Sequence, residues 1–292
     1  MKTTILILLS GIFLTSCSTQ PQEDKKVELP TSMVHEIESQ YVPNMTYDIF
    51  IDLPPGYNSS NNTYPVVYLL DAYETYGLML QTYQQLIYGL IPEMIIVGIS
   101  YQIDGEFYSD GLKEYFDTRA RDYLPTFLSR EEIAEKHGRG FANYVRYSGG
   151  GDNFLVFIEK ELIPYIESEY RADPQRRGLF GYSLGGTFTS YCLFSKPRLF
   201  KDYFIGSPML LWDDKVIFTF DNTDKLIGTT DTINVYTCWG EFEPEHRSLF
   251  RDYLEDKNNP NIRITSEVLQ GETHLSGLGR AYSRAFRTFY EK

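Results

Sequence analysis

The stretch RGLFGYSLGG, residues 177–186, decides the fold of this chain. Within it, Ser183 lies between Gly181 and Gly185 in the pattern Gly-x-Ser-x-Gly. So short a pattern arises by accident in roughly one chain in ten of this length, and a serine between turn-forming glycines is therefore the alternative interpretation. The pattern gains meaning where a strand turns sharply into a helix, because that turn presents the serine hydroxyl as a nucleophile. Here the apolar run 178–182 precedes the serine and a helix-like segment follows, which favours the nucleophile.

Apolar runs recur along the chain with helical patterns between them, which is typical of a mostly parallel sheet with helices on both faces. The runs predict eight strands, at residues 34–40, 46–53, 66–70, 94–100, 178–182, 203–206, 233–239 and 262–269. The clearest helices are expected at residues 153–170, 184–195, 245–257 and 278–290. In the first of these, Asp152 is the candidate N-cap and Pro164 should cause a kink. Residues 101–151 are too long for a plain loop and should cross one face of the sheet.

A nucleophilic Ser183 requires a histidine base and a carboxylate that orients it, because a serine hydroxyl is nearly inert at neutral pH. In the α/β-hydrolase fold these residues follow in the order serine, acid, histidine. His35 and His137 precede the serine, and His246 lies on the apolar face of a predicted helix, where a packing or capping role is expected. His274 lies in a loop just after the last predicted strand, so it is the predicted base.

The acid should lie just past the predicted strand 233–239, where Glu241 and Glu243 compete for the role. The oxyanion hole needs two backbone N–H groups. One should come from Leu184, directly after the nucleophile, and the other from the loop that begins at residues 71–73.

The composition excludes several classes of partner. The chain has 27 basic and 40 acidic residues, a formal net charge of −13, which disfavours nucleic acid and polyanionic substrates. Cys192 and Cys238 lack metal-ligand spacing and are expected to be buried apolar residues, with a disulfide between them as an open alternative. Serine chemistry needs no metal or organic cofactor, and no obligate protein partner is inferred.

The first residues, MKTTILILLSGIFLTSCS, resemble a bacterial lipoprotein signal. The apolar run 5–14 is too short to span a bilayer and has the length of a signal-peptide core. Residues 14–17, Leu-Thr-Ser-Cys, resemble a lipobox, which predicts cleavage before Cys17 and acylation of that residue. The alternative is an ordinary secretory signal with a stray cysteine. The predicted organisation is a signal peptide at 1–16, a flexible tether at 17–32 and one α/β-hydrolase domain at 33–292, held to a membrane of the bacterial cell envelope by the lipid.

Six segments in order along the chain resemble the putative-esterase family of α/β-hydrolases, the group that contains esterase D, feruloyl esterases, enterochelin-type siderophore esterases and mycolyltransferases. They lie at residues 53–57 (LPPGY), 64–71 (YPVVYLLD), 119–126 (RARDYLPT), 161–167 (ELIPYIE), 181–186 (GYSLGG) and 206–208 (GSP). The resemblance implies Ser183 as nucleophile, His274 as base and Glu243 as acid. It also implies Tyr73 as the second oxyanion donor, although Ala72 stands where the family commonly has glycine. Siderophore esterases of this family can work with little or no acid, so a dyad of Ser183 and His274 is an alternative.

Three residues are candidates for the substrate pocket. Arg119 and Arg121 belong to the predicted excursion, where specificity residues often lie, and Trp212 follows the sixth predicted strand. The simpler alternatives are that the arginines pair with Asp117 and Asp122 and that the tryptophan is part of the core.

The sequence therefore predicts a lipid-anchored serine esterase that hydrolyses a carboxylic ester through an acyl-enzyme on Ser183. The expected substrate is a small-molecule siderophore ester or a carbohydrate acyl or feruloyl ester. Two alternatives stay open: an acyltransferase, in which an alcohol replaces water in the second step, and a binding module that kept the fold and lost its chemistry.

Overall fold

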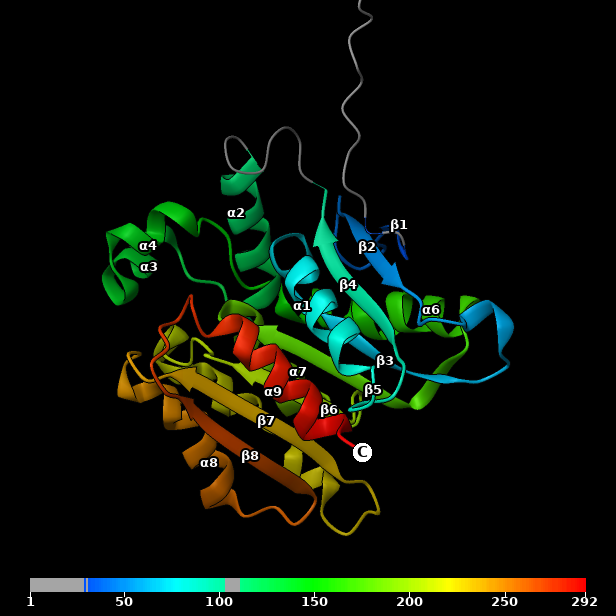
Figure 1. Cartoon of the computed structure of the whole chain (residues 1–292). Helices are drawn as coiled ribbons and strands as arrows, with labels where there is room; N and C mark the ends of the chain where they lie inside the picture. Colours follow the sequence, from blue (N-terminus) through cyan, green and yellow to red (C-terminus); the bar gives the residue numbers. More distant parts are fainter. Residues whose placement is uncertain (1–28, 30, 103–110) are drawn as a thin grey trace, which may run out of the picture. The chain divides into compact units, whose positions relative to one another are not determined.

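The computed structural model describes residue 29 and residues 31–102 and 111–292. Contacts divide the chain into residues 1–30 and residues 31–292, and the second unit holds one eight-stranded sheet (Figure 1). Its strand order is β1-β2-β4-β3-β5-β6-β7-β8. The strands are β1 Ser32–Glu38, β2 Thr46–Asp52, β3 Tyr64–Leu69, β4 Ile95–Tyr101, β5 Ala172–Tyr182, β6 Asp202–Gly206, β7 Ile233–Gly240 and β8 Ile262–Leu269. β1 and β2 pair antiparallel with their neighbours, and β3 to β8 are parallel. The predicted α/β-hydrolase sheet is confirmed.

Helices cover both faces of the sheet because its central strands are apolar on both sides. Every residue of β3, β4 and β6 is buried, as expected for parallel strands between two helical layers. One layer is formed by α1 Ala72–Leu86 and α9 Leu278–Tyr290 (Figure 1). The other is formed by α2 Leu112–Tyr123, α5 Gly151–Phe157, α6 Ile163–Glu169, α7 Leu184–Ser195 and α8 Leu249–Lys257.

The predicted excursion is largely helical where it is described. It contains α2 and two short helices, α3 Arg130–His137 and α4 Arg139–Tyr144. α3 begins with a capping box, in which the Ser129 hydroxyl accepts from the N–H of Glu132 and the Glu132 carboxylate accepts from the N–H of Ser129. The chain then returns to the sheet through α5.

The predicted helix 153–170 differs from the structure in two ways. It begins at Gly151 with Gly150 as N-cap, so Asp152 lies inside the first turn and is not the cap. It is also divided into α5, a π-helical turn at Ile158–Leu162 and α6. Pro164 lies in the first turn of α6, where its missing N–H and its ring disfavour a regular α-helical bond, and the wider π turn directly precedes it.

Short 3-10 turns complete the described unit: η1 Tyr57–Ser59, η4 Trp212–Phe220, η5 Thr223–Leu226 and η6 Glu245–Ser248. Cys192 and Cys238 are both buried and free, so no disulfide joins them. The part of the chain that the structure describes contains no helix long and apolar enough to cross a membrane. The predicted signal peptide, Cys17 and most of the predicted tether lie outside the described residues.

Candidate active site

Ser183 occupies a sharp turn between β5 and α7. Its backbone angles, φ 58° and ψ −121°, are uncommon for a residue with a side chain, and its N–H donates to the carbonyl of Gly206 at 2.9 Å. The turn depends on glycine, since a Cβ on Gly181 would collide with the carbonyl oxygen of Gly185. The sequence therefore builds the strained strand-to-helix turn that presents a nucleophile in this fold.

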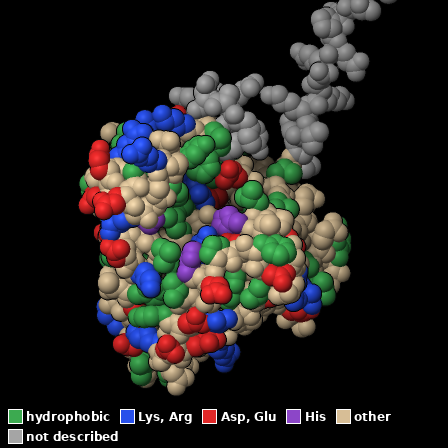
Figure 2. All heavy atoms as spheres, turned by 90° about the vertical axis from the view of Figure 1, so that its left-hand side faces the viewer, with side chains coloured by type: hydrophobic (Ala, Val, Ile, Leu, Met, Phe, Trp, Pro, Cys, Tyr) green, Lys and Arg blue, Asp and Glu red, His purple; other side chains and the backbone are tan. Residues whose placement is uncertain are grey.

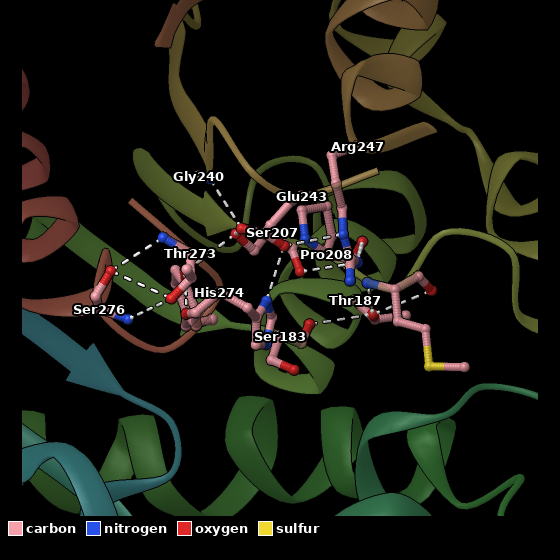
Figure 3. A network of polar contacts seen from close by, with 12 residues as sticks. Ser183, Thr187, Ser207, Pro208, Gly240, Glu243, Arg247, Thr273, His274 and Ser276 are labelled. Atoms are coloured by element: carbon pink, nitrogen blue, oxygen red, sulfur yellow. Dashed lines mark hydrogen bonds and ion pairs between the residues drawn. The ribbon is translucent and has the colours of Figure 1, made fainter. Parts of the chain in front are cut away.

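His274 is held by Glu243. The glutamate follows β7 and the histidine follows β8, and their parallel strands bring the two side chains to the same edge of the sheet. His274 Nδ1 lies 2.8 Å from Glu243 Oε2 (Figure 3). The carboxylate accepts a hydrogen bond from the N–H at Nδ1, which leaves the lone pair of Nε2 available as a base. In the view of Figure 3 the imidazole ring lies between Glu243 and Ser183.

The Glu243 carboxylate is ionised at neutral pH. Its side chain is only 3% exposed, and burial raises the pKa, but hydrogen bonds from His274, the Ser207 hydroxyl and the Gly240 N–H outweigh this effect and lower the pKa to about 2. Glu241 is exposed, and its carboxylate accepts from the N–H of Gly271 at 2.7 Å. The structure thus brings Glu243, and not Glu241, to the histidine.

Two cavities meet at Ser183. The smaller, about 270 Å³, is lined by both Ser183 and His274. The larger, about 700 Å³, opens beside the serine. It is lined by Leu112, Phe116, Arg119, His137, Phe141, Tyr144, Val145, Ser183, Leu184, Met209, Leu211, His246 and Arg247. This face of the molecule shows histidine and hydrophobic side chains around a hollow (Figure 2). The described residues contain no cluster of three or more His, Cys, Asp or Glu side chains that could hold a metal ion.

Comparison with known proteins identifies the family of this chain. Residues 39–277 match the family described as "Putative esterase". The chain belongs to this family. It is 34% identical over 263 residues to the ferri-bacillibactin esterase BesA of Bacillus subtilis (strain 168), an alignment that covers 84% of each chain.

Solved structures resemble the esterase in the same way. The BES protein from Bacillus cereus is similar with a TM-score of 0.77 and 25% identity, over 92% of this chain and 99% of that one. The IroE-like serine hydrolase from Shewanella oneidensis is similar with a TM-score of 0.72 and 27% identity, over 89% and 80%. The chain is therefore a serine carboxylic ester hydrolase.

The two predicted oxyanion donors lie at helix N-termini in the esterase. Leu184 is the first residue of α7, and Tyr73 is the second residue of α1. Asp71, Glu74 and Thr75, from the start of α1, line the smaller cavity together with Ser183. Backbone N–H groups in the first turn point out of a helix and carry its partial positive charge, so both ends suit a developing negative charge.

The arginine pocket candidates have different surroundings. Arg119 lines both cavities, but its guanidinium is bidentate on Asp71, with N···O distances of 2.5 and 2.8 Å, so the simpler alternative of a pair with Asp117 is wrong. Burial lowers the pKa of Arg119, and Asp71 more than compensates. Arg121 pairs with Asp122 at 2.7 Å and lines a separate cavity, so the structure does not bring it to Ser183.

Trp212 lies behind the cavity wall. It is 1% exposed, does not line the larger cavity, and donates through Nε1 to the Thr126 hydroxyl at 3.1 Å. Its ring stacks on that of His137, with centroids 5.1 Å apart and an interplanar angle of 7°. Trp212 therefore supports the pocket indirectly, through His137. The sequence analysis excluded His137 as the base because it precedes Ser183 in the chain.

Sequence reasoning also missed other walls of the cavity. Phe116, Phe141 and Tyr144 come from the helical excursion. The aromatic content of that stretch is the sequence feature that could have pointed to them. His246, expected to pack on a helix, lies instead in the η6 turn and lines the cavity. The predicted helix 245–257 begins as the 3-10 turn η6 and becomes α-helical only at Leu249.

Proposed function

We propose that the esterase uses Ser183 as nucleophile, His274 as general base and Glu243 as the acid that orients it. The observation that carries this assignment is the 2.8 Å contact from Glu243 Oε2 to His274 Nδ1, with His274 and Ser183 lining one cavity. A carboxylate at Nδ1 fixes the tautomer and stabilises the imidazolium that forms during the reaction.

In the proposed reaction, Ser183 Oγ attacks the ester carbonyl carbon and its proton passes to His274 Nε2. The backbone N–H groups of Leu184 and Tyr73 stabilise the oxyanion of the tetrahedral intermediate. The intermediate collapses, and the leaving alcohol takes the proton from His274. Water then attacks the acyl-enzyme with His274 again as base, which releases the acid and restores the serine.

We infer that the substrate is a siderophore ester with an aromatic part that accepts hydrogen bonds. The chain has a net charge of −13, yet the larger cavity is lined by two arginines and two histidines and by no carboxylate. Its other walls include Phe116, Phe141 and Tyr144. Aromatic walls and side-chain N–H groups suit an aromatic ring system that carries hydrogen-bond acceptors. The name of the ferri-bacillibactin esterase assigns a ferric siderophore to that relative, which supports the same substrate class here.

An activity panel on the purified protein tests this proposal. It compares a tris-catecholate trilactone siderophore, with and without ferric iron, with a feruloylated sugar and a short-chain chromogenic ester, and the products are followed by chromatography. We expect the siderophore to give the highest kcat/KM and Ser183→Ala to abolish hydrolysis of every substrate. Preferred cleavage of the feruloylated sugar would contradict the substrate assignment, and an active Ser183→Ala variant would contradict the mechanism.

We further propose that Cys17 carries a lipid that anchors the esterase to a membrane of a bacterial cell envelope. The support is the lipobox-like sequence at residues 14–17 after a short apolar run. The lipid would act as the anchor and the catalytic unit would act on a soluble substrate.

A further inference from the structure

A buried hydroxyl holds the side of Glu243 that faces away from His274. Ser207 is 0% exposed, and its hydroxyl lies 2.6 Å from Glu243 Oε1. The N–H of Gly240 donates to the same oxygen at 2.8 Å. Oε1 is therefore fixed by two donors, and Oε2 is left to face His274 (Figure 3).

The proton positions direct the Ser207 hydroxyl to Glu243 and leave its contact with Tyr182 without a proton between the two oxygens. Tyr182 donates its hydroxyl proton to the carbonyl of His274 at 2.7 Å. The Ser207 hydroxyl, 3.1 Å from that of Tyr182, has one proton, and the carboxylate of Glu243 has none to give. The Ser207 proton therefore points to Glu243. Through these contacts Ser207 adjoins both the group that holds the imidazole ring and the group that holds the main chain of His274.

The backbone of Ser207 indicates that the hydroxyl is needed. Its φ is 40°, in the left-handed region where glycine is favoured and a serine is strained. Its N–H donates to the carbonyl of Cys238 at 2.7 Å, which fixes this conformation. Pro208 follows directly and restricts the backbone further. A glycine would relieve the strain at this position but could not donate to Glu243.

Arg247 holds the other side of the same turn. Its Nη1 donates to the carbonyl oxygens of Ser207 and Pro208, at 3.1 and 2.5 Å. Its Nε lies 3.1 Å from Glu243 Oε2, an ion pair without hydrogen-bond alignment. Arg247 thus supplies the counter-charge for the covered carboxylate and fixes the turn that carries Ser207.

We propose that Ser207 is a positioning residue of the esterase, whose hydroxyl aligns the Glu243 carboxylate. This inference rests on the proposed roles of Ser183, His274 and Glu243. It gives the segment Gly206-Ser207-Pro208 a function in catalysis, although Ser207 lines neither cavity at Ser183.

The test compares Ser207→Gly with Ser207→Ala in the full-length protein on a small chromogenic ester. Both variants lose one hydrogen bond to a charged group, so we expect kcat to fall about 10- to 100-fold with KM changed less than about threefold. Ser207→Gly should melt at a higher temperature than Ser207→Ala, because both lose the hydroxyl and only glycine relieves the backbone strain. The two variants would then share the loss of kcat but differ in thermal stability, which a purely structural role does not produce. Ser190→Ala is the matched control, because it removes a buried hydroxyl that bonds only to the carbonyl of Gly186.

Two further measurements locate the effect at Glu243. In a Glu243→Gln background, Ser207→Gly should cost less than about twofold in kcat, because the carboxylate it aligns is gone. In the wild-type background, loss of the donor should move the acidic limb of the kcat profile to higher pH. The other titratable groups that face this carboxylate are common to all variants: His274, Arg247, His246, Tyr182 and Cys238.

The outcomes separate this inference from the mechanism. Wild-type kcat and pH profile for Ser207→Gly, with Ser183→Ala inactive, would overturn the role of Ser207 alone. Equal losses from Ser207→Gly in the wild-type and Glu243→Gln backgrounds would also overturn it. An active Ser183→Ala variant would instead overturn the proposed mechanism.

Discussion

Glu243 and Glu241 lie two residues apart and have opposite surroundings, which allows a matched test at the residue scale. Glu243 is covered and contacts His274, whereas Glu241 is exposed and its carboxylate accepts a hydrogen bond from the backbone N–H of Gly271. Removing a triad acid can cost up to about ten-thousandfold in turnover. We expect Glu243→Gln to lower kcat by about a hundredfold or more and Glu241→Gln by less than about threefold, in steady-state assays on one ester. Equal activity of both variants would favour the Ser183 and His274 dyad.

The low pKa of Glu243 also predicts a pH dependence of stability. Its pKa is about 2 in the folded protein against an ordinary value of 4.5. A carboxyl with a lowered folded pKa contributes stability that is present above its unfolded pKa and is lost as the pH falls through the folded value. Thermal unfolding of the wild type and Glu243→Gln should therefore show the largest difference in Tm above about pH 5. The difference should shrink between about pH 4.5 and 2, and a constant difference down to pH 3 would contradict this.

At the residue scale, chain order predicts that Ser183 and His274 each follow a strand, and the structure brings both side chains to one cavity. The strand pattern left Glu241 and Glu243 open, and only the family resemblance implied Glu243. The turn after β7 brings this residue, and not Glu241, to His274. The sequence also does not identify which charged side chains pair with each other. Arg119 pairs with Asp71, 48 positions away, and a nearest-acid argument cannot find such a pair.

At the scale of elements, α3 contributes the stacked ring of His137 to the cavity wall. The ring lies against the buried Trp212 and lines the cavity. Burial and the neighbouring Lys136 lower its pKa, so it is neutral at pH 7 and can stack against an aromatic group. We expect His137→Ala to raise KM for an aryl ester about 2- to 10-fold, since an aromatic pair is worth about 0.5–1.5 kcal/mol.

Short alkyl esters provide the internal comparison for this variant, because they offer no ring to stack. Their KM should change less than about twofold, and kcat for both substrates should be retained. His35→Ala is a suitable control, since His35 contacts Tyr165 and Tyr170 and lines neither cavity at Ser183. An equal rise in KM for aryl and alkyl esters would exclude a specific stacking role.

Strands were easier to predict than helices because buried parallel strands form continuous apolar runs. The helix α1 was missed, although its buried positions at 72, 75, 76, 79, 80, 83 and 86 follow a helical period. Its tyrosines and Gly77 obscured that pattern in the sequence. The π turn before Pro164 could not be predicted from the sequence. A proline in a helix predicts a disruption but not which local geometry accommodates it.

At the scale of the whole molecule, the topology assembles the site and the excursion shapes it. Asp71, Ser183, Ser207, Glu243 and His274 each follow a strand of the parallel part of the sheet, so their strands deliver them to one edge. The sequence could predict this convergence from strand order. The sequence could also predict that the excursion carries pocket residues, but not which of its side chains line the cavity, because that depends on how α2, α3 and α4 pack.

The division of the chain at residue 30 predicts that anchoring and catalysis are separable. Cys17 lies in residues 1–30, and all the residues assigned to the reaction lie in residues 31–292. We therefore expect Cys17→Ala, expressed in full length in a bacterial host, to leave the membrane fraction while its kcat on a soluble ester stays within about twofold of the wild type. A single acyl chain binds membranes only marginally, so the wild-type partition also reports whether the processed terminus carries more than one chain. Unchanged membrane attachment of Cys17→Ala would contradict the lipid anchor, whereas release together with lost activity would contradict the separation of the two functions.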